Sequence, residues 1–265
     1  MELFFHLSVF ILGKESRSSP LLAVYNKPVG IQCTMKDPWG RECLDQLHLQ
    51  YPFLSSMHPV GRLDTDTSGL LLFSSNGDLT QSLLHPSSNT EREYEAFVLG
   101  EIGSVDSLTE KLKQGVETSD GRFPASLLEA RATTDLERQM LRSSMGNVTD
   151  SNVTATSYLR LTVTEGKYRM VRRILHNSGH SVVNLHRIRY GNIRLKAINS
   201  TIDEIEVGSV RPCSSGEINW AKGLIAHKLE RKKERTNVPR LIQRRATART
   251  EKKAKVDKQS SKPSF

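Results

Sequence analysis

The feature that most constrains the fold is a short polar turn followed by a continuous apolar run. Residues 58–76 read HPVGRLDTDTSGLLLFSSN, so two aspartates and two glycines stand immediately before the run LLLF at 70–73. An unbroken apolar run of this kind, bounded by turn residues, predicts a strand buried on both faces. The turn before such a strand would present its polar side chains at the edge of the core.

The two carboxylates of this turn are predicted to have different roles. Asp66 is expected to hydrogen bond to nearby backbone amides and so to cap the turn. Asp64 follows Leu63, which should point into the core, and its carboxylate is therefore predicted to lie at the rim of a cleft beside Arg62. A neighbouring cation favours the ionised form of a carboxylate. Asp64 is the candidate for chemistry.

The residues of this turn resemble the catalytic motif of the pseudouridine synthases that modify bacterial ribosomal RNA. The similarity includes GRLD at 61–64, Asp66 and SGLL at 68–71, with NGD at 76–78 and HP at 85–86. Further matching motifs follow the expected order: YNKPVG at 25–30, EGKYRMVRR at 165–173, and LHR at 185–187 with Gly191. The resemblance covers roughly residues 21–195 and implies an isomerase that converts uridines of RNA, most of all ribosomal RNA, to pseudouridine.

The resemblance assigns a role to several residues. Asp64 would be the catalytic aspartate. Tyr94 would supply the ring that stacks on the target uracil, although the sequence reads Arg-Glu-Tyr where the family has Lys-x-Tyr. Arg172 would pair with the catalytic aspartate and hold it in place. Met170 stands where many members have glutamine, and we expect this change to alter at most one contact.

Two further residues are candidates for substrate binding. A uridine inside an RNA helix hides C1′, so the nucleotide should be flipped out, at a cost of a few kcal/mol for unstacking. Arg62 would then fill the vacated space in the stack. Lys27 belongs to the first motif, but an ordinary Asn-Lys-Pro turn is an equally good interpretation of the same residues.

The reaction indicates the same groups without reference to the family. It breaks the bond between C1′ and N1, turns the base and rejoins it through C5, which is glycosidase-like chemistry. It needs a carboxylate near C1′, an aromatic platform and a positioning cation, and Asp64, Tyr94 and Arg172 meet these needs.

No cofactor is required. We expect no metal site, because a glycine separates His176 from His180 and no cysteine or carboxylate stands nearby. Whether Asp64 bonds to C1′ directly or starts another route through the sugar stays open.

Two other functions remain as alternatives. A hydrolytic glycosidase would need a second carboxylate acting across the bond, and Asp66 is expected to be a capping group instead. A non-catalytic RNA-binding or ribosome-assembly protein on the same fold would show binding without any change of the uridine. The product of the reaction distinguishes the three.

The sequence divides into an N-terminal extension (1–20), a catalytic domain (21–213) with an insertion loop at 131–156, and a basic, largely disordered tail (214–265). The net charge is +9, and the segment 222–265 alone carries fifteen Lys and Arg against four Asp and Glu. This concentration of charge predicts a polyanionic partner, RNA. A nuclear or nucleolar address is an equal interpretation of the tail.

The apolar start, MELFFHLSVFIL, is too short to span a bilayer and lacks a leading positive charge, so neither a membrane anchor nor a secretory signal is favoured. An organelle address and a first strand both fit it. About twenty residues before the catalytic domain cannot form the small RNA-binding domain that many family members carry.

Three cysteines without C-x-x-C spacing predict free, mostly buried thiols in a reducing compartment, with mitochondrion, plastid or nucleolus left open. We expect a monomer.

We predict the α+β class, with a mixed, mainly antiparallel central sheet bent into two lobes around a cleft that holds Asp64. Half-buried antiparallel strands are indicated by the alternation around Tyr94 and Leu159. A doubly wound parallel sheet would require regular βαβ units and a glycine-rich phosphate loop, which the sequence lacks. The expected strands are 21–25, 70–73, 93–99, 123–130, 158–163 and 182–190, and the expected helices are 79–84, 104–114 and 167–177, with another near Trp220.

Overall fold

The computed structural model describes residues 20–144, 155–195 and 205–236. One sheet contains β1 (Leu22–Lys27), β2 (His58–Pro59), β3 (Thr67–Ser74), β4 (Arg92–Leu99), β7 (Ser126–Ala132), β8 (Thr156–Val163), β9 (Val182–Tyr190), β10 (Ile193–Arg194) and β11 (Val210–Pro212). A separate hairpin consists of β5 (Val116–Thr118) and β6 (Gly121–Phe123). The helices are α1 (Leu47–Gln50), α2 (Gly77–Leu84), α3 (Val105–Gln114), α4 (Asp135–Ser144), α5 (Met170–Asn177) and α6 (Ser215–Thr236). Short 3-10 turns occupy Leu44–Gln46, Pro52–Ser56 and Pro86–Ser88.

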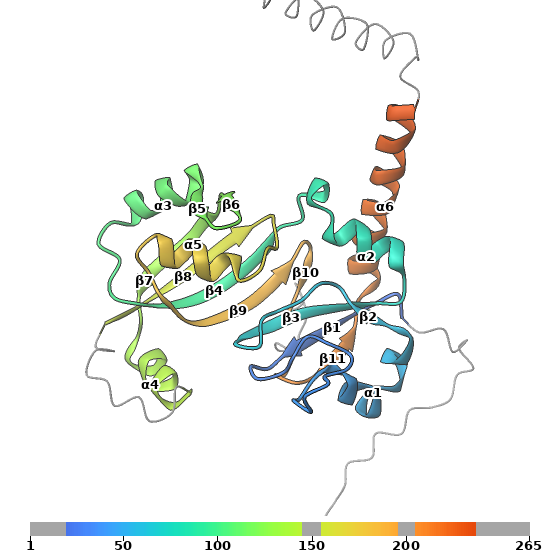
Figure 1. Cartoon of the computed structure of the whole chain (residues 1–265), viewed down its shortest axis with the longest axis horizontal. Helices are drawn as coiled ribbons and strands as arrows, with labels where there is room; N and C mark the ends of the chain where they lie inside the picture. Colours follow the sequence, from blue (N-terminus) through green and yellow to red (C-terminus); the bar gives the residue numbers. More distant parts are fainter. Residues whose placement is uncertain (1–19, 145–154, 196–204, 237–265) are drawn as a thin grey trace, which may run out of the picture.

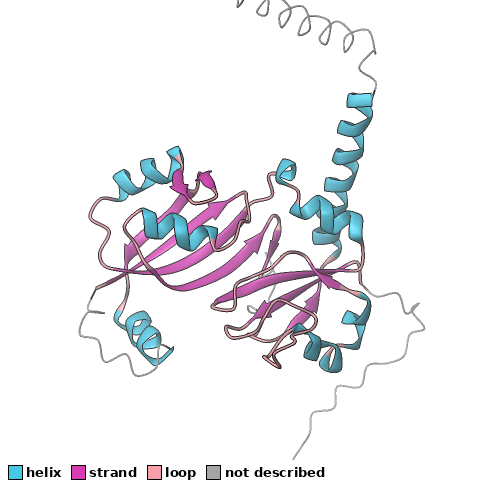
Figure 2. Cartoon of the chain, viewed as in Figure 1, coloured by secondary structure: helices cyan, strands magenta, loops and turns pink. Residues whose placement is uncertain are grey.

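The strand order is β11-β1-β3-β9-β4-β8-β7, with β2 beside β3 and β10 beside β9 (Figure 1). Within this described sheet every pairing is antiparallel except that of β3 with β9. The prediction of an α+β fold with a mixed, mainly antiparallel sheet is therefore confirmed. Figure 2 shows the strands in the middle of the molecule with helices around them, and most of the long helix α6 extends away from the sheet.

The sheet bends into two lobes, as predicted, because its halves are joined by little backbone pairing. One lobe contains β9, β4, β8 and β7 with α3, α4 and α5, and the other contains β3, β1 and β11 with α1, α2 and α6 (Figure 1). The connecting parallel pair, β3 with β9, has a register of three residue pairs that begins at Thr67 opposite Leu185. The turn that carries Asp64 runs directly into this junction.

The central strands are buried on both faces, as the apolar run indicated. Leu71 and Phe73 of β3 belong to one core cluster, while Leu70 and Leu72 belong to a second cluster on the opposite face. All four side chains are fully buried. Strand β1 alternates between the same two clusters, so the two strands hold the lobe together from its middle.

The prediction of half-buried strands around Tyr94 and Leu159 is confirmed for β4 from Glu95 to Leu99, where the outward positions are partly or fully exposed, but it is wrong at Glu93 and for most of β8. Glu93 on β4 is only 2% exposed. Its carboxylate accepts hydrogen bonds from Arg189 Nε at 2.5 Å and from Arg160 Nη1 at 3.5 Å, both on neighbouring strands. A buried carboxylate is tolerated when it is paired and hydrogen bonded. Cross-strand arginines therefore cover Glu93, a position that alternation alone assigned to solvent.

The segment 131–156, expected to be an insertion loop, contains helix α4 (Figure 1). A capping box begins this helix: Thr134 Oγ1 accepts from Glu137 N at 3.2 Å, and Glu137 Oε2 accepts from Thr134 N at 2.8 Å. Leu141 is buried at 5% exposure and fixes the helix to the fold. The expected strand 123–130 is also divided, since Phe123 ends β6 and β7 begins at Ser126.

Helix α6 corrects the predicted boundary at 213/214. The helix packs on the core through Ala221, which is fully buried, and through partly buried Trp220 and Leu224. Ser214 and Glu217 form a second capping box, with distances of 2.7 and 3.3 Å. The helix predicted near Trp220 is therefore confirmed, and the beginning of the predicted tail is an ordered helix that packs on the core. The N-terminal apolar stretch and the segment 237–265 lie outside the described residues.

Candidate active site

A cavity of about 250 Å³ opens where the two lobes meet. It is lined by the turn before β3, by β4 and β9, and by the segment that leads into α5. Ligand pockets for drug-sized molecules usually measure about 300–1,000 Å³, so this cavity suits a group no larger than one nucleoside. Its charged lining contains two acids and five cations: Asp64, Glu165, Arg62, Arg92, Lys167, Arg169 and Arg187.

The turn that carries Asp64 is fixed on both sides of this residue. Thr65 accepts a hydrogen bond through its carbonyl oxygen from Gly30 N at 2.8 Å, and Leu63 N donates to Cys33 Sγ at 3.3 Å. Leu63 is 5% exposed and points into the core, as predicted. The Asp64 side chain consequently lines the cavity together with Arg62. This placement at the rim of the cleft confirms the geometry expected from the sequence.

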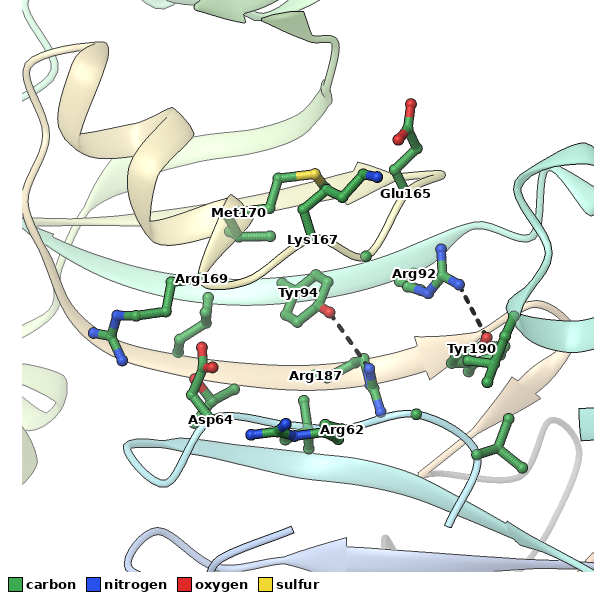
Figure 3. A pocket seen from close by; sticks show the side chains of 18 residues that line it. Arg62, Asp64, Arg92, Tyr94, Glu165, Lys167, Arg169, Met170, Arg187 and Tyr190 are labelled. Carbon is green, nitrogen blue, oxygen red and sulfur yellow. Dashed lines mark hydrogen bonds between the residues drawn. The ribbon is translucent and has the colours of Figure 1, made fainter. Parts of the chain in front are cut away.

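Tyr94 forms the wall above this turn. Its side chain projects from β4 into the cavity and is 8% exposed (Figure 3). The phenol oxygen accepts a hydrogen bond from Arg187 Nη1 at 3.5 Å. An aromatic ring in this position offers a flat surface to a planar group that enters between it and the turn. The fold thus brings Asp64 and Tyr94 to the same cavity. Both were predicted as site residues, and they are thirty residues apart in the sequence.

Arg187 was not among the predicted site residues, although it lies between Tyr94 and the turn that carries Arg62 (Figure 3). It is 3% exposed, and its Nε donates to the carbonyl oxygen of Leu70 at 2.7 Å. The sequence contains a signal for this position. Leu185 and Arg187 are two residues apart in one strand, so their side chains share a face of the sheet. An arginine on the face of the strand that the alternation assigns to the core must be buried, and a buried cation needs polar partners or a functional role.

Arg92 lines the opposite side of the cavity and has a full set of partners. Its Nη1 donates to the carbonyl oxygen of Thr164 at 2.6 Å, and its Nη2 donates to the hydroxyl of Tyr190 at 3.0 Å. The Tyr190 hydroxyl in turn donates to the carbonyl oxygen of Leu83 at 2.9 Å. Arg92 therefore connects strands of one lobe to the helix of the other and acts as a structural cation.

Arg169 stands at the entry to α5 in a left-handed conformation, with φ of 48°. This conformation is costly for a residue with a side chain and tends to occur at functional sites. It explains why the predicted helix 167–177 begins at Met170 instead of Lys167. The Arg169 side chain is directed back to the turn, where it donates to both carboxylate oxygens of Asp66 at 2.9 and 2.8 Å.

The family model for RNA pseudouridylate synthase matches residues 21–177, more than half of the chain. The chain belongs to this family. Its matched region contains the turn with Asp64, the strand with Tyr94 and helix α5, and thus three of the elements that form the cavity.

Several bacterial proteins are similar in sequence. The ribosomal large subunit pseudouridine synthase B of Haemophilus influenzae is 38% identical over 175 residues, which are 65% of this chain and 42% of that protein. The protein of the same name from Bacillus subtilis is 28% identical over 214 residues, 81% of this chain and 76% of that protein. The chain therefore spans less than half the length of the H. influenzae relative.

A solved structure titled as a pseudouridylate synthase shares the fold. It superimposes with a TM-score of 0.57 and 24% identity, and the alignment covers 77% of this chain and 74% of the other. The chain and this solved structure therefore have the same overall fold.

Arg172, expected to pair with Asp64, makes its direct contacts with the neighbouring acid. Its Nη2 donates to the carbonyl oxygen of Asp66 at 2.7 Å and lies 3.4 Å from Asp66 Oδ2. Burial lowers the pKa of the Arg172 guanidinium, and the charge of Asp66 opposes this effect. Arg172 thus positions the backbone of the turn that carries Asp64 and Asp66. The correction follows from the direction of helix α5, which aims this side chain at the turn two residues beyond Asp64.

Asp66 has a further role beside the one predicted. Its carboxylate accepts a hydrogen bond from its own backbone amide and also joins Arg169, which precedes α5, and Arg172 of α5 to the turn. Burial raises the pKa of Asp66, but the hydrogen bond from Arg169 and the charges of both arginines outweigh it and leave the pKa below its ordinary value. The pairing ties the turn to the opposite lobe across the cleft.

Lys27 does not line the cavity, and its side chain is fully buried. Its Nζ donates to the carbonyl oxygens of Pro28 at 2.8 Å and Ile31 at 3.0 Å, and desolvation lowers its pKa. These bonds close the loop whose Gly30 N binds Thr65. Lys27 therefore supports the turn that carries Asp64 from behind, which fits the alternative of a turn residue better than a contact with substrate.

Among the described residues, no helix is long and apolar enough to cross a bilayer. The described part of the chain also contains no group of three or more His, Cys, Asp and Glu side chains arranged to hold a metal ion. The cysteines are free, with Cys43 and Cys213 buried and Cys33 partly buried, as predicted.

Proposed function

We propose that this chain isomerises specific uridines of RNA to pseudouridine, with ribosomal RNA as the substrate and Asp64 as the catalytic carboxylate. The observation that supports this most strongly is the common cavity of Asp64 and Tyr94 in a member of the RNA pseudouridylate synthase family. The names of the bacterial relatives favour ribosomal RNA over other RNAs.

Each group of the cavity has a place in this reaction. Asp64 acts at C1′ of the flipped nucleotide, either as a nucleophile or by starting another route through the sugar. Tyr94 stacks on the uracil and keeps it in the cavity while the glycosidic bond is open. Arg62, exposed at the mouth, fills the place that the flipped base leaves in the RNA stack. Arg172 and Lys27 hold the backbone of the turn.

RNA is the partner that suits the charge of the site. Five cations surround two acids in the cavity lining, so the mouth attracts a phosphate backbone. Because residues of a single chain form the complete lining, we propose that the protein acts as a monomer. The reaction needs no metal or redox step, so we propose catalysis by the side chains alone.

Asp64→Asn tests the proposed function, because an amide of nearly the same size cannot attack or activate the sugar. Pseudouridine formed in unmodified ribosomal RNA is measured by carbodiimide derivatisation and mass spectrometry. We expect the variant to fold, to bind RNA and to lose at least roughly 10⁴-fold in turnover, as for the loss of a catalytic nucleophile. Asp66→Asn is the matched control from the same turn and should retain measurable turnover.

The product decides between the proposal and its alternatives. Intact RNA with an isomerised uridine supports the synthase, a released base supports a hydrolytic glycosidase, and binding without change supports a non-catalytic RNA-binding protein. An Asp64→Asn variant that melts normally and still forms pseudouridine would show that the assignment of Asp64 is wrong. Total RNA from a deletion strain, compared with the parent strain, identifies the modified site.

A further inference from the structure

Arg187 is a buried cation that lacks a counter-charge. Its side chain is 3% exposed and lines the cavity, yet no carboxylate of the described residues forms an ion pair with it. Nε and Nη1 have neutral partners, the carbonyl of Leu70 and the hydroxyl of Tyr94, whereas Nη2 has no hydrogen-bond partner in the described structure. An uncompensated buried charge is unfavourable, so a partner is expected from outside the chain.

The other cations of the cavity do not share this property. Arg169 is paired with Asp66, and the guanidinium of Arg92 is bonded to Thr164 and Tyr190. Arg62 and Lys167 are exposed, so their charges are accessible to solvent. Arg187 alone among these arginines combines deep burial with a free donor at the cavity wall. Its guanidinium lies 6.0 Å from the centre of the Tyr94 ring, beside the surface proposed to hold the base.

The proposed reaction generates an anion at this place. When the bond between C1′ and N1 breaks, its electron pair leaves with N1, and the uracil carries one negative charge shared among N1, O2 and O4. This holds whether Asp64 bonds to C1′ or a proton is removed from the sugar. C5 then bonds to C1′, and this step releases the Asp64 carboxylate from C1′ or, on the other route, is accompanied by return of the proton to the sugar. C5 finally loses its hydrogen as a proton, and N1 takes up a proton. The base is therefore anionic only between bond cleavage and rejoining.

We propose that Arg187 stabilises the detached uracil anion through Nη2, and so is a further catalytic residue of this site. The inference rests on the proposed function. A fixed cation in a water-poor cavity is most effective where charge develops during the reaction. The contact of Nη1 with the Tyr94 hydroxyl holds the guanidinium at the edge of the aromatic surface, where it faces the carbonyl oxygens of a stacked base. The uracil can also turn within the cavity and keep this hydrogen bond, because the turn that brings C5 to C1′ puts O4 in the place of O2, opposite Nη2.

The test compares two leaving groups under single-turnover conditions. RNA is prepared with uridine or with 5-fluorouridine at the target position, and the rate constant for loss of the N-glycoside is measured. Fluorine stabilises the departing anion, so the fluorinated base depends less on a protein cation. We expect Arg187→Met to slow the uridine substrate by roughly 10²–10³-fold and the fluorinated substrate by a factor about tenfold smaller. Arg187→Lys keeps the charge and should show a smaller defect with the same preference.

Arg92→Met is the matched control, because Arg92 is equally buried and lines the same cavity but has its partners within the chain. It should slow both substrates by the same factor. Equal factors for both substrates in Arg187→Met would overturn the proposal. If that variant fails to melt cooperatively, Arg187→Lys decides in the same way. Failure of the wild-type protein to convert either substrate would instead contradict the proposed function.

Discussion

Gly69 on β3 lies directly against the backbone of Arg187 on β9, so that a Cβ atom at position 69 would be 2.3 Å from the Arg187 carbonyl oxygen. The two residues are register partners in the parallel pair that joins the lobes. Gly69 also has φ of +103°, a conformation that side chains rarely adopt. The junction between the lobes therefore depends on a position without a side chain, and the same junction presents Arg187 to the cavity.

Gly69→Ala should separate β3 from β9, since the new methyl group meets backbone and not a flexible side chain. We expect a loss of about 3 kcal/mol or more in the free energy of unfolding, from overpacking and from the unfavourable φ. Gly77→Ala is the matched control, because no atom lies within 4 Å of its Cβ position and its φ is ordinary. Urea denaturation of both variants checks this expectation. Equal midpoints for the two variants would contradict the close approach.

Glu137 should make the stability of the α4 region depend on pH. The hydrogen bond from Arg131 and the amide of Thr134 lower the pKa of Glu137 to about 2, from an ordinary value of 4.5. A carboxyl whose pKa is lower in the folded than in the unfolded protein stabilises the fold fully above the unfolded value, and this contribution disappears as the pH falls through the folded value. The stability difference between wild type and Glu137→Gln should therefore be constant above pH 4.5 and shrink toward pH 2.

Denaturant unfolding at a series of pH values measures this difference. High salt should weaken it only in part, because Arg131 contacts both oxygens of Glu137, at 2.8 and 2.7 Å. A difference that stays the same from pH 6 to pH 2 would show that the pair does not form.

Removal of residues 237–265 should weaken RNA binding without affecting the fold. This segment holds nine Lys and Arg against two Asp and Glu, a net charge of +7. Each lost phosphate contact should reduce the salt dependence of log K by about 0.7–0.9. Removal of 222–265 should in addition lower the melting temperature by roughly 5 °C, because Leu224 and Ile225 pack on the core. Filter binding at several salt concentrations and thermal melts separate the two effects, and equal salt slopes before and after the shorter truncation would refute an RNA-binding role for this segment.

Local sequence determined the elements that carry the site. The run 70–73 indicated a central strand because all four positions are apolar, and the structure buries it on both faces. The turn residues before it placed Asp64 at a cleft, since Leu63 had to point into the core. The capping boxes Thr134-x-x-Glu137 and Ser214-x-x-Glu217 were also local signals. The first of them indicates α4, which the expectation of a loop at 131–156 overlooked, and the second marks the start of α6, the helix expected near Trp220.

Tertiary structure alone decided how the charges are paired. Asp66 and Arg169 are separated by 103 positions, and which acid of the turn the α5 arginines reach depends on the relative placement of the two lobes. Burial of Glu93 likewise requires Arg189, which comes from another strand. The free donor of Arg187 results from packing in which its hydrogen-bond partners are the Leu70 carbonyl and the Tyr94 hydroxyl and, among the described residues, no carboxylate. Periodicity and turn chemistry act over a few residues and are therefore visible in sequence, whereas the partner of a buried charge is set by long-range contacts.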